Sequence, residues 1–220
     1  MHGVYLRDDL ARDPAKALAW VRSAGLDTAI VNVAHARTLT ALAQATIDTY
    51  TFALPDACMP DTWRRTLIRL CEVARVTKAR GICIDPEMGW AKAPRTERAA
   101  LRDALGAVAQ SMHVIVTTHD GLRSFAADLS QKLGPLGCIG SPQVYDHQMG
   151  APLDRPAKVV AKWAAQNWAA VVPSAGSFGA DVASFQAYFA ALPKAFGGLI
   201  WYAGAAPTGK RLAAIRAWAA

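Results

Sequence analysis

The sequence has none of the features that mark a membrane protein, a secreted disulfide scaffold or a zinc protein. No apolar run approaches the roughly 20 residues that a transmembrane helix needs, and the first residues lack the basic and apolar regions of a signal peptide. The four cysteines are widely spaced and form no Cys-x-x-Cys pair, so neither a zinc site nor a disulfide framework is indicated. We therefore expect a soluble protein that is cytoplasmic as synthesised and has no membrane partner.

A glycine-rich phosphate loop is absent as well. No Gly-x-Gly-x-x-Gly or Walker-type pattern occurs, and the segment Gly176–Gly179 is too short to count as one. An open doubly wound sheet usually carries such a loop after its first strand, where this chain has Tyr5 to Asp9. This absence argues against that fold, and no cofactor is expected.

The chain carries an excess of positive charge. Its 220 residues include 24 Lys and Arg against 17 Asp and Glu, which gives a formal net charge of +7. Such an excess suits an acidic cell-wall polymer or nucleic acid, but the basic residues are scattered along the chain, which also fits solvated helix surfaces. The length and the 53% hydrophobic content allow a substantial core in one domain, residues 1–220.

Eight apolar, β-prone stretches are present, each followed by a segment with helical periodicity or helix-forming composition. The expected strands are residues 3–6, 28–33, 49–54, 81–84, 113–118, 138–145, 169–172 and 198–202. The expected helices are residues 14–23, 38–45, 62–78, 96–110, 121–133, 156–166, 181–192 and 210–220. This alternation predicts right-handed parallel βαβ units. Eight units predict an α/β fold of the compact (β/α)8 TIM barrel type, with the active site at the C-terminal ends of the strands.

Two carboxylates follow the fourth expected strand. Side chains alternate faces in an extended chain, so Cys83, Asp85 and Glu87 share one side. Two carboxyl groups this close can split their pKa values, so that one stays ionised while the other holds a proton near neutral pH. The pair is a candidate acid catalyst with a polar helper. The alternative is a structural pair that caps a helix or binds a surface arginine.

The ends of other strands supply further polar and aromatic groups. Amide, hydroxyl and carboxylate groups can bind sugar hydroxyls, and aromatic faces can pack against sugar C–H surfaces. The candidate substrate-binding residues are Tyr5, Gln143, Tyr145, Asp146 and Trp201, with Trp90 in the loop after the carboxylate pair either lining a subsite or packing in the interior. The histidines His35, His119 and His147 lack the spacing of a metal site, so no metal is expected.

Three of these segments resemble motifs of family 18 glycoside hydrolases, the chitinase and endo-N-acetylglucosaminidase group. The segment from Gly81 to Glu87 is similar to that family's fourth-strand signature, which ends in Asp-x-Glu. The segment from Gln143 to Asp146 resembles its sixth-strand motif. The segment from Gly198 to Trp201 resembles its eighth strand, where a tryptophan forms the floor of the subsite. The fuller fourth-strand motif has two upstream aspartates, where this chain has Arg80 and Cys83.

The resemblance implies a role for each matching residue. Glu87 would protonate the glycosidic oxygen, and Asp85 would orient the 2-acetamido group of the substrate. Tyr145 would hydrogen-bond the oxazolinium-like intermediate, assisted by Gln143 and Asp146, and Trp201 would pack beneath the sugar. No separate protein nucleophile is required in this substrate-assisted scheme. The implied partner is a polysaccharide, peptidoglycan or chitin-like, and not nucleic acid.

Two alternatives remain open from the sequence. Family 25 lysozyme-like muramidases also carry Asp-x-Glu in a small barrel, but they place another aspartate in the first strand, where this chain has Tyr5, and Asp8 would have to substitute. A phage-type endolysin released to act on an acidic wall would suit the basic charge and the lack of a signal peptide. The other alternative is a non-catalytic carbohydrate-binding barrel.

Overall fold

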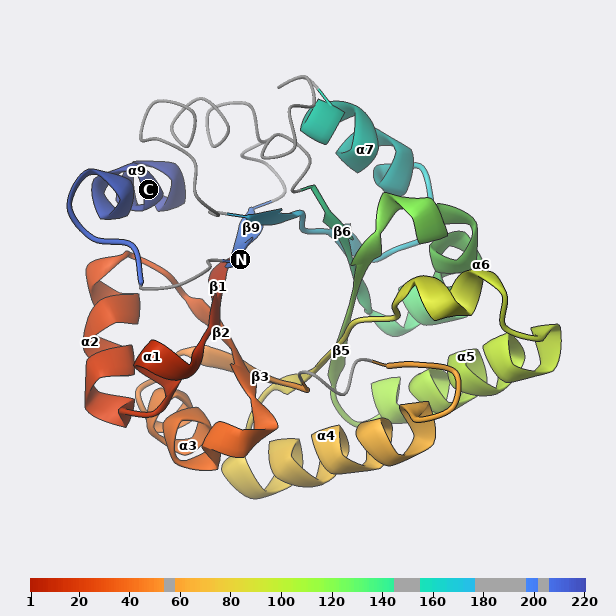
Figure 1. Ribbon diagram of the computed structural model, residues 1–220, viewed down its shortest axis with the longest axis horizontal. Coiled ribbons are helices and arrows are strands. Elements are labelled where there is room, and N and C mark those ends of the chain that lie inside the picture. Colours follow the sequence, from red (N-terminus) through yellow and green to blue (C-terminus); the bar gives the residue numbers. More distant parts are fainter. Residues whose placement is uncertain (54–57, 145–154, 177–196, 202–205) are drawn as a thin grey trace.

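The computed structural model describes residues 1–53, 58–144, 155–176, 197–201 and 206–220, with strands arranged in a ring and helices outside it (Figure 1). The strands are β1 His2–Leu6, β2 Thr28–Asn32, β3 Asp48–Phe52, β4 Gly81–Ile84, β5 His113–His119, β6 Ile139–Gln143, β7 Ala170–Val171, β8 Ser174–Gly176 and β9 Gly198–Trp201. The α-helices are α1 Asp8–Ala11, α2 Pro14–Ser23, α3 Ala36–Gln44, α4 Trp63–Thr77, α5 Arg95–Ala109, α6 Arg123–Leu133, α7 Arg155–Ala164 and α9 Gly209–Ala219. Within the described residues, four 3-10 helices lie between them: η1 Val33–His35, η2 Met88–Ala91, η3 Asp120–Leu122 and η4 Gly134–Leu136.

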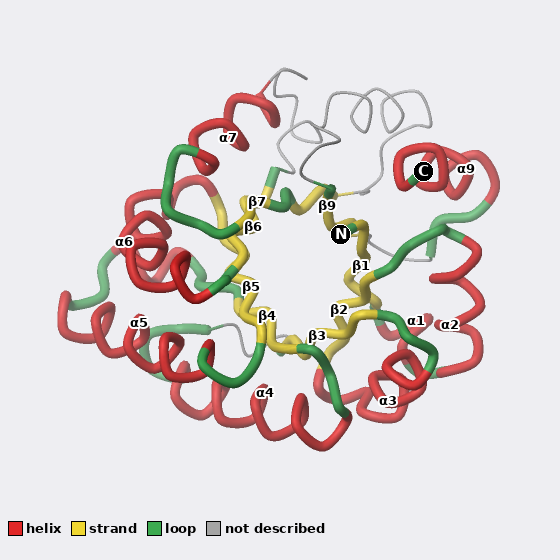
Figure 2. The backbone as a smooth tube through the Cα atoms, turned by 180° about the vertical axis from the view of Figure 1, so that it is seen from behind, coloured by secondary structure: helices red, strands yellow, loops and turns green. Residues whose placement is uncertain are grey.

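The strands close into a parallel barrel, as the sequence predicts. Hydrogen bonds run from β1 through β2, β3, β4, β5, β6, β8 and β9 back to β1, and every pairing among the described strands is parallel. Figure 2 shows the closed ring from behind, with the helices outside it. Parallel neighbours bring the C-terminal ends of all strands to the same rim, where a (β/α)8 barrel carries its active site. No described helix is long and apolar enough to span a bilayer.

The seventh strand differs from the prediction. We expected one strand over residues 169–172, but the structure divides this position between β7, which pairs with β6 alone, and β8, which bridges β6 and β9. Pro173 lies between the two segments and has no N–H to donate to a ladder. Its carbonyl still accepts a hydrogen bond from the Leu199 N–H at 2.8 Å. The proline interrupts the strand, and β8 closes the ring.

The helices match the prediction closely. The helix α2 begins and ends at the predicted residues, and the Asp13 carboxylate caps its first turn by accepting hydrogen bonds from the N–H groups of Ala15 and Lys16. The four-residue helix α1 was not predicted, since it is too short to show a period. The predicted helix over residues 181–192 lies outside the described residues.

Two apolar layers hold the barrel together. The outer layer lies between the strands and the helices, and it includes most of the buried Leu, Val and Trp side chains. The inner layer fills the barrel and consists of inward-facing strand residues, namely Tyr5, Ile30, Tyr50, Phe52, Cys83, Ile115, Val172 and Leu199. Because side chains alternate along a strand, Asp85 follows Cys83 on the inward face and stands at the C-terminal rim of the barrel.

Candidate active site

Asp85 and Gln143 meet at the C-terminal rim of the barrel. The Gln143 side chain extends from the end of β6, and its Nε2 donates a hydrogen bond of 3.0 Å to Asp85 Oδ1, just after β4. The backbone carbonyl of Asp85 accepts a hydrogen bond from the Cys58 N–H at 3.3 Å, which joins the loop after β3 to the loop after β4. Two of the predicted site residues are therefore brought together by the fold.

Asp85 is the carboxyl group of the pair that holds a proton. Burial, followed by the negative charge of Glu87, raises the pKa of Asp85 to about 8, while the hydrogen bond from Gln143 acts in the opposite direction. The Asp85 carboxyl is consequently protonated at neutral pH. The sequence leaves open which acid of the pair holds the proton, and the raised pKa belongs to Asp85, the residue that the family 18 resemblance casts as orienting the substrate and not as the acid.

Glu87 occupies a different environment from its neighbour. Its side chain is exposed, and it immediately precedes η2 without capping that helix. Between the two acids, the Pro86 carbonyl accepts a hydrogen bond of 2.6 Å from Thr118 Oγ1 on β5, which fixes the segment against the barrel. The fold thus places a neutral, largely buried carboxyl group two residues before an exposed one.

Below Asp85, polar groups are linked inside the barrel. The Tyr5 hydroxyl lies 3.6 Å from Cys83 Sγ and 3.2 Å from Ser174 Oγ, and Ser174 Oγ lies 2.7 Å from Ser141 Oγ. Tyr5 is only 2% exposed. Its hydroxyl therefore belongs to the barrel interior and not to the substrate-binding surface that we expected. Ser141 and Ser174 give no signal in the sequence that would place them in this cluster.

Cys83 changes the electrostatics beneath Asp85. It stands where the family 18 motif has an aspartate, and it is fully buried. Burial raises the pKa of the Cys83 thiol well above its ordinary value, so the group is uncharged. Asp85 has a neutral neighbour below it, and Glu87 is the negative charge that raises its pKa.

Trp90 packs in the interior, which corrects the expectation that it lines a sugar subsite. The side chain is fully buried, its ring is stacked on Phe125 at a centroid distance of 5.2 Å, and its Nε1 donates to the Cys58 carbonyl oxygen. Trp90 therefore anchors η2 to α6 and to the segment after β3 that contains Cys58.

Arg80 does not neutralise either acid. It lies before β4, at the N-terminal end of the barrel, where its Nη1 forms an ion pair with Asp48 and its Nε donates to His113 Nδ1 at 3.2 Å. The whole length of β4 separates this pair from Asp85 and Glu87.

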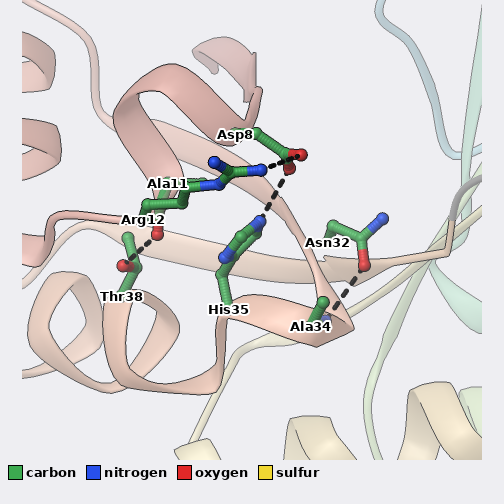
Figure 3. Close-up of polar contacts among 7 residues, drawn as sticks. All are labelled: Asp8, Ala11, Arg12, Asn32, Ala34, His35 and Thr38. Atoms are coloured by element: carbon green, nitrogen blue, oxygen red, sulfur yellow. Dashed lines mark hydrogen bonds and ion pairs between the residues drawn. The ribbon is translucent and has the colours of Figure 1, made fainter.

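Asp8 lies on the same rim as the candidate acids but is already bound (Figure 3). Its Oδ1 is 2.8 Å from His35 Nε2, and its Oδ2 accepts a hydrogen bond of 3.3 Å from Arg12 Nη2. The hydrogen bond from His35 is the main cause that lowers the pKa of Asp8. Nearby, Asn32 Oδ1 accepts from the Ala34 N–H and so caps η1. Through its contact with His35, the Asp8 carboxylate joins the segments that follow β1 and β2, as Figure 3 shows.

The remaining predicted residues are described in part or not at all. Tyr145 and Asp146 lie outside the described residues, as does His147. The backbone of Trp201 is in β9, beside Tyr5 of β1, and its side chain is not described. Their predicted roles stay predictions. Among the described residues, no three His, Cys, Asp or Glu side chains form an arrangement that could hold a metal ion.

Comparison with known proteins supports the fold and goes no further. No protein-family model and no curated protein matches the sequence. Among solved structures, the chain is similar to a β-mannanase from Thermomonospora fusca, with a TM-score of 0.67 and 14% sequence identity over 97% of this chain and 82% of that chain. A likeness at this identity shows a shared (β/α)8 barrel and leaves the activity to be argued from the site.

Proposed function

We propose that the protein is a glycoside hydrolase that cleaves β-linked N-acetylhexosamine polymers of the peptidoglycan or chitin class. One observation carries the proposal: a buried carboxyl group that is protonated at neutral pH, Asp85, precedes the exposed Glu87 at the C-terminal rim of the barrel. Acid catalysis of glycoside cleavage needs a carboxyl group that holds a proton near neutral pH and can pass it to the glycosidic oxygen, directly or through a neighbouring carboxylate. The fold's similarity to a β-mannanase, a polysaccharide hydrolase by its name, is consistent with this assignment.

The two acids have different roles in the proposed reaction. Asp85 holds the proton in the free protein; on substrate binding this proton passes to the exposed Glu87, which donates it to the glycosidic oxygen as that oxygen leaves the anomeric carbon. Asp85 also orients the 2-acetamido group, whose oxygen attacks the anomeric carbon, so that no protein nucleophile is needed. As the family 18 resemblance implies, Tyr145 and Asp146 would assist the intermediate and Trp201 would bind the sugar.

Gln143 supports the same geometry. Its Nε2 donates a hydrogen bond to Asp85 Oδ1, so Oδ2 is the oxygen that carries the proton of the protonated carboxyl group. In the proposed complex, Gln143 thus sets the orientation of Asp85. The family 25 scheme receives less support, since Asp8, its substitute for a first-strand aspartate, is bound by His35 and Arg12.

A second candidate is a carbohydrate-binding barrel without catalysis. Cys83 favours it, because an uncharged thiol replaces the aspartate with which Asp85 would exchange its proton in the family 18 motif. In this reading Asp85, Gln143 and Glu87 bind sugar hydroxyl and amide groups. The two candidates differ in whether a bound oligomer is cut.

The Glu87→Gln variant tests the proposal. Glutamine keeps the shape of the side chain and cannot donate a carboxyl proton, so turnover of a chitin oligomer should fall about 10²-fold or more while binding is retained. The exposed Glu72 on α4 provides the matched control, and Glu72→Gln should keep wild-type turnover. Retention of more than about a tenth of the activity in Glu87→Gln would exclude Glu87 as the acid.

A further inference from the structure

We propose that the groove between α5 and α6 is a second binding site, separate from the barrel mouth, that takes a phosphate monoester of a sugar-sized molecule. The two helices lie side by side on the outside of the barrel (Figure 1). The groove encloses about 410 Å³, which is within the range of roughly 300–1,000 Å³ that is typical of small-molecule sites. Neither the carboxylate pair nor Gln143 contributes to it.

Three arginines of α5 line one wall. Arg95, Arg98 and Arg102 are spaced by three and four residues, so they share one face of the helix, and this face borders the groove. The guanidinium group matches phosphate oxygens because it donates several N–H groups in one plane and stays charged at every physiological pH. A row of three such groups along a small-molecule cavity indicates an anionic ligand.

The Nε of Arg102 lacks a well-placed hydrogen-bond acceptor in the part of the chain that the structure describes. Its Nε is buried, and no acceptor among the described residues forms a hydrogen bond with it. The nearest carboxylate oxygen to this Nε is Asp103 Oδ1, which forms an ion pair with it at 3.5 Å, outside hydrogen-bond geometry, and which also accepts from Lys132 Nζ at 2.7 Å. A buried donor without an acceptor is rare in native proteins. An oxyanion in the groove would supply that acceptor.

Arg98 is fixed in place. Its Nε and Nη2 donate to the carbonyl oxygens of Ala93 and Ala91, at 3.1 and 2.6 Å, and its guanidinium group lies 5.8 Å from the centre of the Phe125 ring. The positive charge is therefore already held beside the groove before a ligand arrives. Preorganised donors of this kind bind a ligand at a lower cost in side-chain entropy.

The charge and the volume of the groove define the ligand class. The three arginines contribute +3 and Asp128, on α6, contributes −1, which leaves +2 along the groove. A phosphate monoester carries about −1.5 to −2 at neutral pH and so balances this charge. Phe125 and Leu129 also border the groove but are only 2% and 1% exposed, so the carbon atoms of an organic body would contact mainly the aliphatic parts of the arginine side chains. Free phosphate would leave most of the 410 Å³ volume unused.

Calorimetric titration with glucose 6-phosphate, glucose and inorganic phosphate tests the site. Glucose 6-phosphate should bind, glucose should not, and inorganic phosphate should bind more weakly than the ester. Arg102→Ala and Arg95→Ala should each weaken binding of the ester about tenfold, whereas Asp128→Asn should strengthen it. The exposed Arg65 on α4 gives the control variant Arg65→Ala, which should bind as the wild type does.

Distinct results would overturn the proposal. Equal affinities in Arg102→Ala, Arg95→Ala and Arg65→Ala would exclude the groove as the site, provided that all three variants unfold at the wild-type temperature. Affinity for inorganic phosphate equal to that for the ester would exclude the organic ligand. Glu87→Gln should bind glucose 6-phosphate normally, so that failure of the hydrolase assignment leaves this test unaffected.

Discussion

Asp85 differs from an ordinary surface aspartate because the end of β4 buries it beside a second carboxylate. Taking the ionised form out of water is unfavourable, and the charge of Glu87 adds to that cost, so the proton is retained up to about pH 8. The same cost makes the stability of the fold depend on pH. An aspartate is ionised in the unfolded chain above about pH 4, so the folded state binds one more proton than the unfolded state between these two pKa values.

Replacement of Asp85 by asparagine should remove that dependence. The stabilisation from the raised pKa is fully present below the unfolded pKa and is lost as the pH rises through about 8. Between about pH 5 and pH 9, the free energy of unfolding of the wild type should therefore fall by more than about 1 kcal/mol relative to Asp85→Asn. Urea titrations at both pH values measure the difference. The exposed Asp61 provides the control variant Asp61→Asn, which should show the same pH dependence of the free energy of unfolding as the wild type. If the free energies of unfolding of the wild type and Asp85→Asn changed in parallel with pH, the raised pKa of Asp85 would be contradicted.

Gln143 is the group that holds the pKa of Asp85 down. Its Nε2 hydrogen bond stabilises the carboxylate form, so Gln143→Leu should raise the pKa of Asp85 beyond about 8. The carbon-13 resonance of the Asp85 carboxyl group, followed by NMR across the pH range, reports this value directly. Gln44→Leu, on the exposed face of α3, should leave the value unchanged. A lower pKa in Gln143→Leu would mean that the hydrogen bond acts on the protonated form.

At the scale of elements, the loop from β4 to α5 connects the candidate acids to the outside of the barrel. Trp90 in η2 is stacked on Phe125 of α6, and Arg98 of α5 holds the carbonyl oxygens of the same loop. The indole and the guanidinium group thus fix the backbone that begins at Glu87. The helices α5 and α6, which hold this loop, also form the walls of the groove that Arg95, Arg98 and Arg102 line.

Two substitutions of Trp90 distinguish a packing role of its indole from a role in substrate binding. Trp90→Ala should destabilise the fold by about 3–5 kcal/mol, because it opens a cavity in the core. Trp90→Phe keeps an aromatic ring against Phe125 and loses the Nε1 hydrogen bond, which should cost about 1–3 kcal/mol. Thermal and urea unfolding measure both. If both variants were as stable as the wild type but bound chitin oligomers more weakly, the indole would be a subsite residue after all.

The sequence predicts the position of these elements better than the environment of their side chains. The meeting of Asp85 and Gln143 follows from strand order, because the ends of parallel strands share one rim. The burial of Trp90 does not follow, since a tryptophan in a loop gives no period from which to infer its face. Which acid holds the proton depends on burial, a property of the assembled barrel, and the pattern Asp-x-Glu is the same in either case.

For the whole molecule, the barrel fold could be predicted from the sequence. Eight apolar stretches alternating with helical segments admit few topologies once crossovers are right-handed, and the observed ring follows that order. The division of the seventh strand at Pro173 could not be predicted, because segments as short as β7 and β8 show no alternation of apolar and polar residues. The spacing of Arg95, Arg98 and Arg102 in the sequence places them on one face of a helix, but the groove exists only because α6 packs beside that face.

The measurement that tests the proposed activity most directly is mass spectrometry of the products after incubation with peptidoglycan and with chitin oligomers. The wild type should release fragments with a new reducing-end N-acetylhexosamine, and Glu87→Gln should release none above background. The identity of that sugar separates a glucosaminidase from a muramidase. If both proteins bind the polymers equally and neither cuts them, the hydrolase assignment is wrong and the barrel is a carbohydrate-binding module.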